Sequence, residues 1–128
     1  MSSYKGYIKN ANGEECYTLN DTGWIDLSPY LSSHYSAWGD GYRTPRMRKY
    51  NGEVILEGTI KGSGSNQLVA TLPVGYRPAQ NMNFVIAGYY MEQGKVTKLQ
   101  ILPSGRIELQ DNDALSWTCL NGIRFFTD

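Results

Sequence analysis

Residues 71–78 (TLPVGYRP) and the strands expected on either side of them decide the fold. In residues 50–61 (YNGEVILEGTIK), apolar side chains recur at every second position, and polar ones mostly fill the positions between them. That period of two, opened by Asn51-Gly52, predicts a tight turn followed by a half-buried strand. An apolar strand at 83–91 (NFVIAGYYM) follows, and then a hairpin over 95–110 that turns at its PSG sequence. The order predicts an antiparallel sheet.

The remaining sequence supports the same fold class. Fourteen Gly and five Pro punctuate short segments, and no window longer than ten residues has a 3.6-residue apolar stripe. A chain of 128 residues is one domain by size. The prediction is an all-β fold, an antiparallel β-sandwich or jelly-roll-like barrel. Strands are expected at 46–50, 53–61, 67–72, 83–91, 95–102, 105–110 and 115–126, the last broken at Asn121-Gly122.

The N-terminal segment differs from the rest in its small apolar content. Residues 1–22 alternate weakly around Asn12-Gly13, which predicts a hairpin or arm that connects to a β-sandwich head over 23–128. Within the head, Trp24 lies in a short strand, 23–27 (GWIDL), and is expected in the core.

The order of motifs resembles a known family. A strand ending in LPxGYRP, another strand, a hairpin with SGRI, a Trp and a closing GIRFF are similar to the C-terminal head domains of bacteriophage tail-fibre and baseplate receptor-binding proteins. The resemblance covers residues 23–126. It implies a homotrimeric virion component at the phage tail tip, assembled in the bacterial cytoplasm and joined to other tail or baseplate proteins. In the signature itself, Tyr76 and Arg77 are expected to be structural, since Pro73 and Pro78 fix the backbone around them.

The strand at 83–91 carries apolar side chains on both faces. Val85, Ala87 and Tyr89 lie on one face, whereas Phe84 and Ile86 lie on the other. Antiparallel strands in a small sandwich normally keep one face in water, so the second face is expected to meet a neighbouring subunit. The resemblance independently implies a trimer.

Charge and cysteine usage narrow the function further. Twelve basic and twelve acidic residues give no net charge, which argues against a nucleic-acid binder. The basic cluster at residues 43–49 is interpreted as a solvated strand face. The first residues (MSSYKGYIKN) have no apolar core of a signal peptide, and no segment is long enough to insert in a membrane. Cys16 and Cys119 are expected to be free thiols, with Cys119 buried beside Trp117, although a disulfide between them stays open.

No catalytic or metal-binding set is recognisable. The carboxylates lie at polar strand positions or in turns, and 111–113 (DND) lacks the glycine and closing glutamate of a calcium loop. His34 is the sole histidine, and no GxSxG motif accompanies it. We therefore expect no enzyme activity, no cofactor and no metal.

Aromatic side chains provide the candidate site. Residues 28–45 form a long irregular segment that is rich in aromatic rings, and such a loop is uncommon in a compact domain unless it is functional. Trp and Tyr can stack on sugar rings while polar neighbours bind hydroxyls. We predict non-catalytic recognition of a host cell-wall saccharide. A structural trimerisation cap and a glycan depolymerase are the alternatives. The predicted site has Trp38 as platform, His34, Asp40 and Arg43 as polar contacts, and Tyr42 or Tyr35 as side walls.

Overall fold

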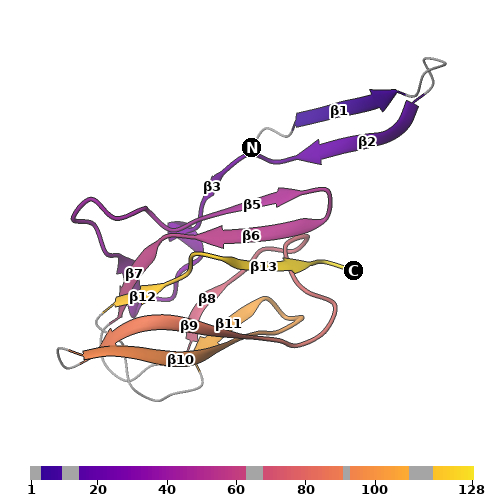
Figure 1. Cartoon of the computed structure of the whole chain (residues 1–128). Helices are drawn as coiled ribbons and strands as arrows, with labels where there is room; N and C mark the ends of the chain where they lie inside the picture. Colours follow the sequence, from indigo (N-terminus) through magenta and orange to yellow (C-terminus); the bar gives the residue numbers. More distant parts are fainter. Residues whose placement is uncertain (1–3, 10–14, 63–67, 91–92, 110–116) are drawn as a thin grey trace.

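Two antiparallel sheets lie face to face (Figure 1). The computed structural model describes residues 4–9, 15–62, 68–90, 93–109 and 117–128, with the backbone alone described at 4–9, 15–19 and 90. Within these ranges, a single 3-10 turn, Ser28–Tyr30, is the helical structure. None of the described segments is a helix of the length and apolarity needed to cross a bilayer. The predicted all-β, antiparallel fold is confirmed.

The first sheet has the strand order β1-β2-β5-β6-β13, and β3 pairs with β5. Asn51 and Gly52 both have positive φ, 48° and 83°, as a two-residue hairpin turn requires. This turn sets the β5–β6 register, in which Arg46 lies opposite Glu57. The strands are β1 (Tyr4–Lys9), β2 (Glu15–Asp21), β3 (Ile25–Asp26), β5 (Arg46–Tyr50), β6 (Glu53–Glu57) and β13 (Ile123–Phe126).

The second sheet has the order β4-β7-β12-β9-β10-β11-β8 and is almost closed into a barrel. Its edge strands approach each other through the segment before β4, where Leu31 forms a bridge with Ala70 and the Ser32 N–H donates to the Val69 carbonyl at 2.8 Å. The strands are β4 (Tyr35–Ala37), β7 (Thr59–Gly62), β8 (Leu68–Thr71), β9 (Met82–Tyr90), β10 (Gln93–Ile101), β11 (Arg106–Leu109) and β12 (Trp117–Cys119).

The chain crosses between the sheets at two adjacent corners. The expected strand at 53–61 is divided at Gly58, which has φ 118° and lies so close to Pro45 that a Cβ would collide with the proline backbone. The break at Asn121-Gly122, predicted from sequence, forms the second corner. The Asn121 side-chain oxygen accepts from the Gly58 N–H at 2.7 Å and thereby links the two corners.

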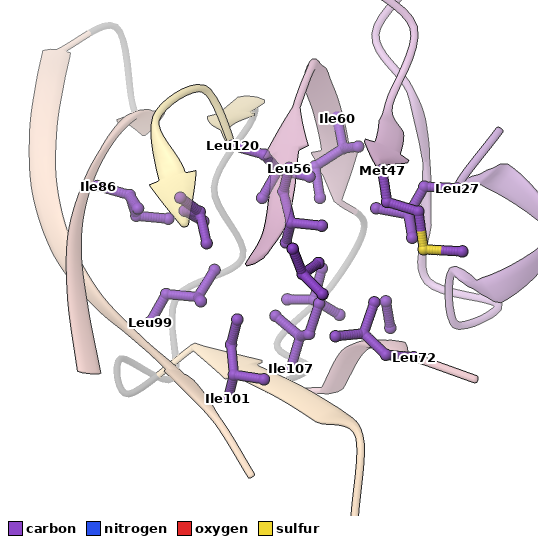
Figure 2. Packing of buried hydrophobic residues seen from close by; sticks show 14 of the residues in the cluster. Leu27, Met47, Leu56, Ile60, Leu72, Ile86, Leu99, Ile101, Ile107 and Leu120 are labelled. Carbon is purple, nitrogen blue, oxygen red and sulfur yellow. The ribbon is translucent and has the colours of Figure 1, made fainter. Parts of the chain in front are cut away.

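The core fills the space between the sheets (Figure 2). Inward side chains of β6 and β10, such as Leu56 and Leu99, are completely buried. Burying each aliphatic side chain of this size stabilises the fold by about 1.5–3 kcal/mol. Trp24 was expected here, but it is 38% exposed. The reason is strand parity, because Ile25 pairs with the buried Met47 and the preceding Trp24 therefore points outward.

The TLPVGYRP segment has a structural role, as its prolines suggested. The Tyr76 N–H closes a turn onto the Pro73 carbonyl at 3.1 Å, and the Arg77 Nε donates to the Leu72 carbonyl at 2.9 Å. The Leu72 N–H in turn donates to the carbonyl of Gly105, in the β10–β11 turn. Gly105 has φ 90°, and a Cβ there would lie 2.5 Å from the Leu72 carbonyl oxygen. The signature thus joins two turns at one end of the second sheet.

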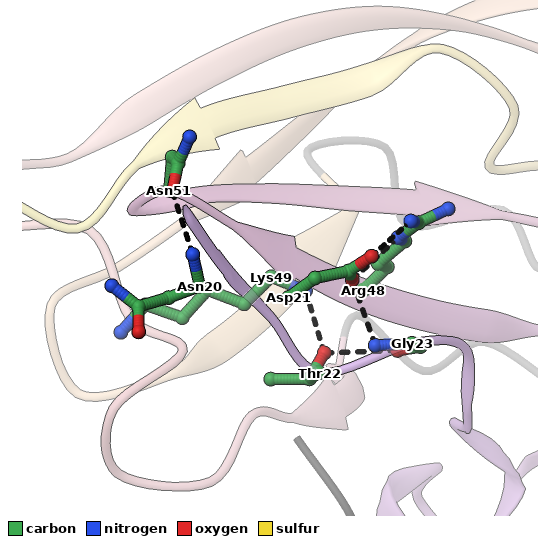
Figure 3. Close-up of polar contacts among 7 residues, drawn as sticks. All are labelled: Asn20, Asp21, Thr22, Gly23, Arg48, Lys49 and Asn51. Carbon is green, nitrogen blue, oxygen red and sulfur yellow. Dashed lines mark hydrogen bonds and ion pairs between the residues drawn. The ribbon is translucent and has the colours of Figure 1, made fainter. Parts of the chain in front are cut away.

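The β1–β2 hairpin extends from the body and is joined to it at one point (Figure 1). β2 pairs with β5 at Asp21 and Tyr50. Arg48 forms two hydrogen bonds to the Asp21 carboxylate, which also accepts from the Gly23 N–H at 2.8 Å (Figure 3). These hydrogen bonds, led by that of Arg48, lower the pKa of Asp21. The junction lies close to the boundary predicted between residues 22 and 23. Asn12-Gly13 lies outside the described residues.

Candidate functional site

Two adjoining hollows lie at the end of the first sheet and share Thr44 and Arg46. The larger, about 440 Å³, is lined by Gly41, Tyr42, Arg43, Thr44 and Arg46. The smaller, about 180 Å³, is lined by Trp24, Ile25, Asp26, Thr44, Pro45 and Arg46. Each hollow therefore has one exposed aromatic side chain, Tyr42 at 60% and Trp24 at 38%, beside a guanidinium group, and the smaller hollow also has the Asp26 carboxylate. We call this pair of hollows the Tyr42–Trp24 site.

A tight turn holds Tyr42 away from the body. The Tyr42 N–H donates to the Gly39 carbonyl at 3.0 Å, and Asp40 within this turn has φ 51°. On either side of the turn, the backbone is hydrogen-bonded to Thr59. The Trp38 N–H donates to the Thr59 carbonyl, and the Thr59 N–H donates to the Arg43 carbonyl. The backbone on both sides of Tyr42 is thus fixed to β7, which restrains an exposed ring on a short protrusion.

Ion pairs and ring stacking position the arginines. Glu57 accepts from Arg46 and lies 3.5 Å from the Nε of Arg43. The guanidinium of Arg46 also lies over the Trp24 ring, 4.0 Å from its centre. A cation–π contact at an exposed position contributes about 0.5–1 kcal/mol. Arg46 is therefore held between a carboxylate and a ring. Its planar guanidinium has more N–H donors than these contacts use, so donors remain that can bind a ligand.

The structure separates the residues predicted for the site. Tyr42 and Arg43 line one hollow together. His34 lines a different one, of about 110 Å³, with Tyr35 at its wall. Tyr35 is buried in the core cluster, and this burial raises the pKa of its phenol. Trp38 is half-buried and is not a lining residue of the Tyr42–Trp24 site, while Asp40 is exposed in the turn beside it.

Sequence reasoning missed Arg46 and placed Trp24 in the core, although a signal for Arg46 was present. In 46–50 (RMRKY) and 53–57 (EVILE), a period of two places Arg46, Arg48 and Glu57 on the face opposite Met47. A two-residue turn at Asn51-Gly52 then pairs Arg46 with Glu57. Within the basic cluster, Arg46 and Arg48 form an outer strand face and make ion pairs, whereas Arg43 precedes β5 and Lys49 pairs with the buried Val54 on the other side of the sheet.

Within the described ranges, no three His, Cys, Asp or Glu side chains are grouped to hold a metal ion. Cys119 is a free thiol, and it is half-buried where full burial was expected. It lies on the outer side of β12 with Trp117, because Thr118 between them faces the core. The side chain of Cys16 lies outside the described residues.

Neither a protein-family model nor a curated protein matches this sequence. A solved structure does match: the receptor binding protein (gp15) of Listeria phage PSA, with a TM-score of 0.61 and 19% sequence identity. The alignment covers 86% of this chain and 66% of that chain, so this chain corresponds to slightly less than two thirds of the other protein.

This chain has the fold of a phage receptor-binding protein. At 19% identity, the similarity concerns the fold and leaves the site to be argued from its own residues. The expected resemblance to receptor-binding proteins is supported at the level of the fold. The narrower assignment to a C-terminal head domain stays a prediction.

Proposed function

We propose that this chain attaches a phage tail to its bacterial host by binding a cell-surface saccharide without cleaving it. The carrying observation is the Tyr42–Trp24 site, where two exposed aromatic side chains stand beside guanidinium and carboxylate groups on a receptor-binding fold. Aromatic rings present an apolar face to the C–H face of a sugar ring. The neighbouring Arg43 donates hydrogen bonds to hydroxyls, and Asp26 accepts them.

The site is open and shallow, which fits weak binding by each copy. Hydrogen bonds to hydroxyls replace bonds to water and give little net free energy. We expect a dissociation constant between about 10 µM and 1 mM, or about −4 to −7 kcal/mol. Several heads that engage one cell wall would raise the overall affinity without any new contact.

The placement of the carboxylates supports recognition without hydrolysis. A glycosidase needs two carboxyl groups that face each other across a cleft. Here Arg46 stands between Asp26 and Glu57 on neighbouring strands, because it pairs with Asp26 on one side and with Glu57 on the other. Among the other described glutamates, Glu53 is bound by Arg124 and Glu108 by Arg106.

We further propose a homotrimer formed through the outer face of β9 and β10. Val85 is 77% exposed and Val96 is 70% exposed. Ala87 lies between them as the cross-strand neighbour of Val96. On the same face, Tyr89 stacks on Trp117 with ring centres 6.0 Å apart and an interplanar angle of 4°. Lys98, the exposed cross-strand neighbour of Val85, lies on the same face. An exposed surface that carries this many apolar side chains is typical of a subunit interface.

In this proposal the trimer forms the tip of a phage tail, is assembled in the bacterial cytoplasm, and is joined through its β1–β2 hairpin to other tail or baseplate proteins. A two-stranded ribbon alone is marginally stable in water, which supports a partner for the hairpin. A trimerisation cap without a ligand is the alternative function, since it would use the same apolar face.

Binding of the labelled full chain to a panel of purified bacterial cell walls tests the proposal. We expect saturable binding to the walls of some hosts, and loss of that binding after periodate treatment, which cleaves vicinal diols of sugars. Binding that survives periodate would indicate a protein or lipid receptor. Binding to no wall would favour the structural cap, and the release of short saccharides would indicate a depolymerase.

A further inference from the structure

We propose that the bound saccharide is an uncharged linear chain of several units that lies across the outer face of β5, β6 and β13, from the Tyr42–Trp24 site to Phe126. The inference rests on the proposed function and specifies the class of its ligand. We call the added surface the distal strip and define it by Arg48, Tyr50, Ile55, Arg124 and Phe126.

Strand register places these side chains on one continuous face. Tyr50, Glu53 and Phe126 are direct neighbours across β5, β6 and β13, and Arg48, Ile55 and Arg124 form the adjacent row. The buried Val54 and Phe125 point to the opposite side. The exposed aromatic side chains of the described residues all gather here: Tyr50 and the 57%-exposed Phe126 lie on the strip, and Trp24 and Tyr42 lie at its other end.

Each arginine of the face is already paired with a carboxylate. Arg48 binds Asp21, and Arg124 binds Glu53 at 2.8 Å, in addition to the pair of Arg46 with Glu57. With Arg43 and Asp26 included, the face holds four arginines and four carboxylates and has no net formal charge. An anionic ligand would have to compete with these carboxylates, whereas neutral hydroxyl groups can bind the N–H groups and oxygens that remain.

The size of the face favours a chain over a single sugar. Strands β3, β5, β6 and β13 lie side by side, so at the usual strand spacing β3, which directly follows Trp24, is about 14 Å from β13, which carries Phe126. Rings at the two ends, with arginine–carboxylate pairs between them, provide successive contacts along an extended ligand. The ion pairs also hold the polar groups in place before binding, which reduces the entropic cost of ordering them.

The distribution of charge favours a saccharide over a protein partner. Protein interfaces are depleted of charged residues at their centre and have charges at the rim. Here Arg46, Arg48 and Glu57 lie within the face. The outer face of β9 and β10 carries Lys98 beside the exposed Val85 and Val96, has fewer charged groups than the face of β5 and β6, and is the surface that we propose for a second copy.

The test uses the full chain and named probes. An array carries linear oligomers of glucose, rhamnose and N-acetylglucosamine, together with counterparts that contain uronic acid or glycerol phosphate. We expect the neutral oligomers to bind and the affinity to rise from two to six units. Between about 50 and 500 mM NaCl, calorimetry should show less than about a twofold change. Phe126→Ala should lower the affinity for a six-unit chain about fivefold to tenfold and leave that for two units unchanged.

Val74→Ala provides the matched control, because Val74 is exposed and lies outside the face, in the turn after β8. Preferential binding of the charged oligomers, a strong salt dependence, or an unchanged six-unit affinity in Phe126→Ala would overturn this inference while saccharide recognition stood. A failure to bind any saccharide would overturn both. A change of oligomer mass in Phe126→Ala would identify the face as a protein interface and would also overturn the inference.

Discussion

Val85→Asp tests the proposed trimer at a position where the substitution should change the stability of the isolated chain very little. Val85 is 77% exposed in the single chain, so burial in an assembly would recover roughly three quarters of the 1.5–3 kcal/mol of a fully buried valine, about 1–2 kcal/mol per subunit. A carboxylate in its place would stand opposite Lys98, and burying this pair of charges would still cost several kcal/mol per ion through desolvation. Within one chain, the same change at an exposed strand position costs about 1 kcal/mol or less.

Light scattering at micromolar concentration gives the readout. The unchanged protein should have a mass near that of three 14.4-kDa chains, about 43 kDa, and Val85→Asp should have the mass of one chain. Val74→Asp is the matched control and should remain trimeric, because Val74 lies outside the apolar face. A monomeric wild-type protein, or a Val85→Asp variant that stays trimeric, would refute the proposed interface.

Three further predictions concern single residues. Gly105→Ala should lower the melting temperature, because positive φ and the 2.5 Å approach of its Cβ to the Leu72 carbonyl both oppose the substitution; an unchanged melting curve would contradict this account of the signature. Because Arg48 lowers the pKa of Asp21, the native state binds this proton less readily than the unfolded chain. The ionised Asp21 carboxylate therefore stabilises the fold fully above about pH 4, and this stabilisation is lost as the pH falls through the lowered pKa of Asp21. Asp21→Asn should remove that part of the acid destabilisation, and denaturation curves at several pH values would measure it. Trp38→Ala should weaken saccharide binding less than Tyr42→Ala, since Trp38 does not line the site. Calorimetry with the same oligosaccharide compares the two variants. An equal loss of affinity would show that Trp38 belongs to the site.

The strands and their register could be read from the sequence because one physical rule governs both. Side chains alternate between faces, and the Asn51-Gly52 turn allows one pairing of the strands that it joins, so the core positions of β6 follow directly. The division at Gly58 could not be read in the same way. It depends on the close approach of Pro45, which lies 13 positions earlier in the chain.

Only part of the candidate site could be predicted from the sequence, because the direction of a side chain depends on which strand it lies in. The crowding of aromatic residues in 28–45 drew attention to the segment that holds Tyr42 and Arg43, and the structure places these two side chains in one hollow. The sequence did not reveal that residues 35–37 of this segment form β4, whose first side chain, Tyr35, faces the core. Trp24 was assigned to the core as part of the short strand at 23–27, but the parity of β3 relative to Met47 exposes it.

Saccharide recognition at the Tyr42–Trp24 site is the central claim, and a paired titration tests it most directly. Wild-type protein and Tyr42→Ala would be titrated with the strongest oligosaccharide from the array, and thermal melting would be recorded for both. We predict a dissociation constant between about 10 µM and 1 mM for the wild type and at least a tenfold weaker one for Tyr42→Ala, with both proteins folded. Equal affinities of the two folded proteins for that oligosaccharide would contradict the claim.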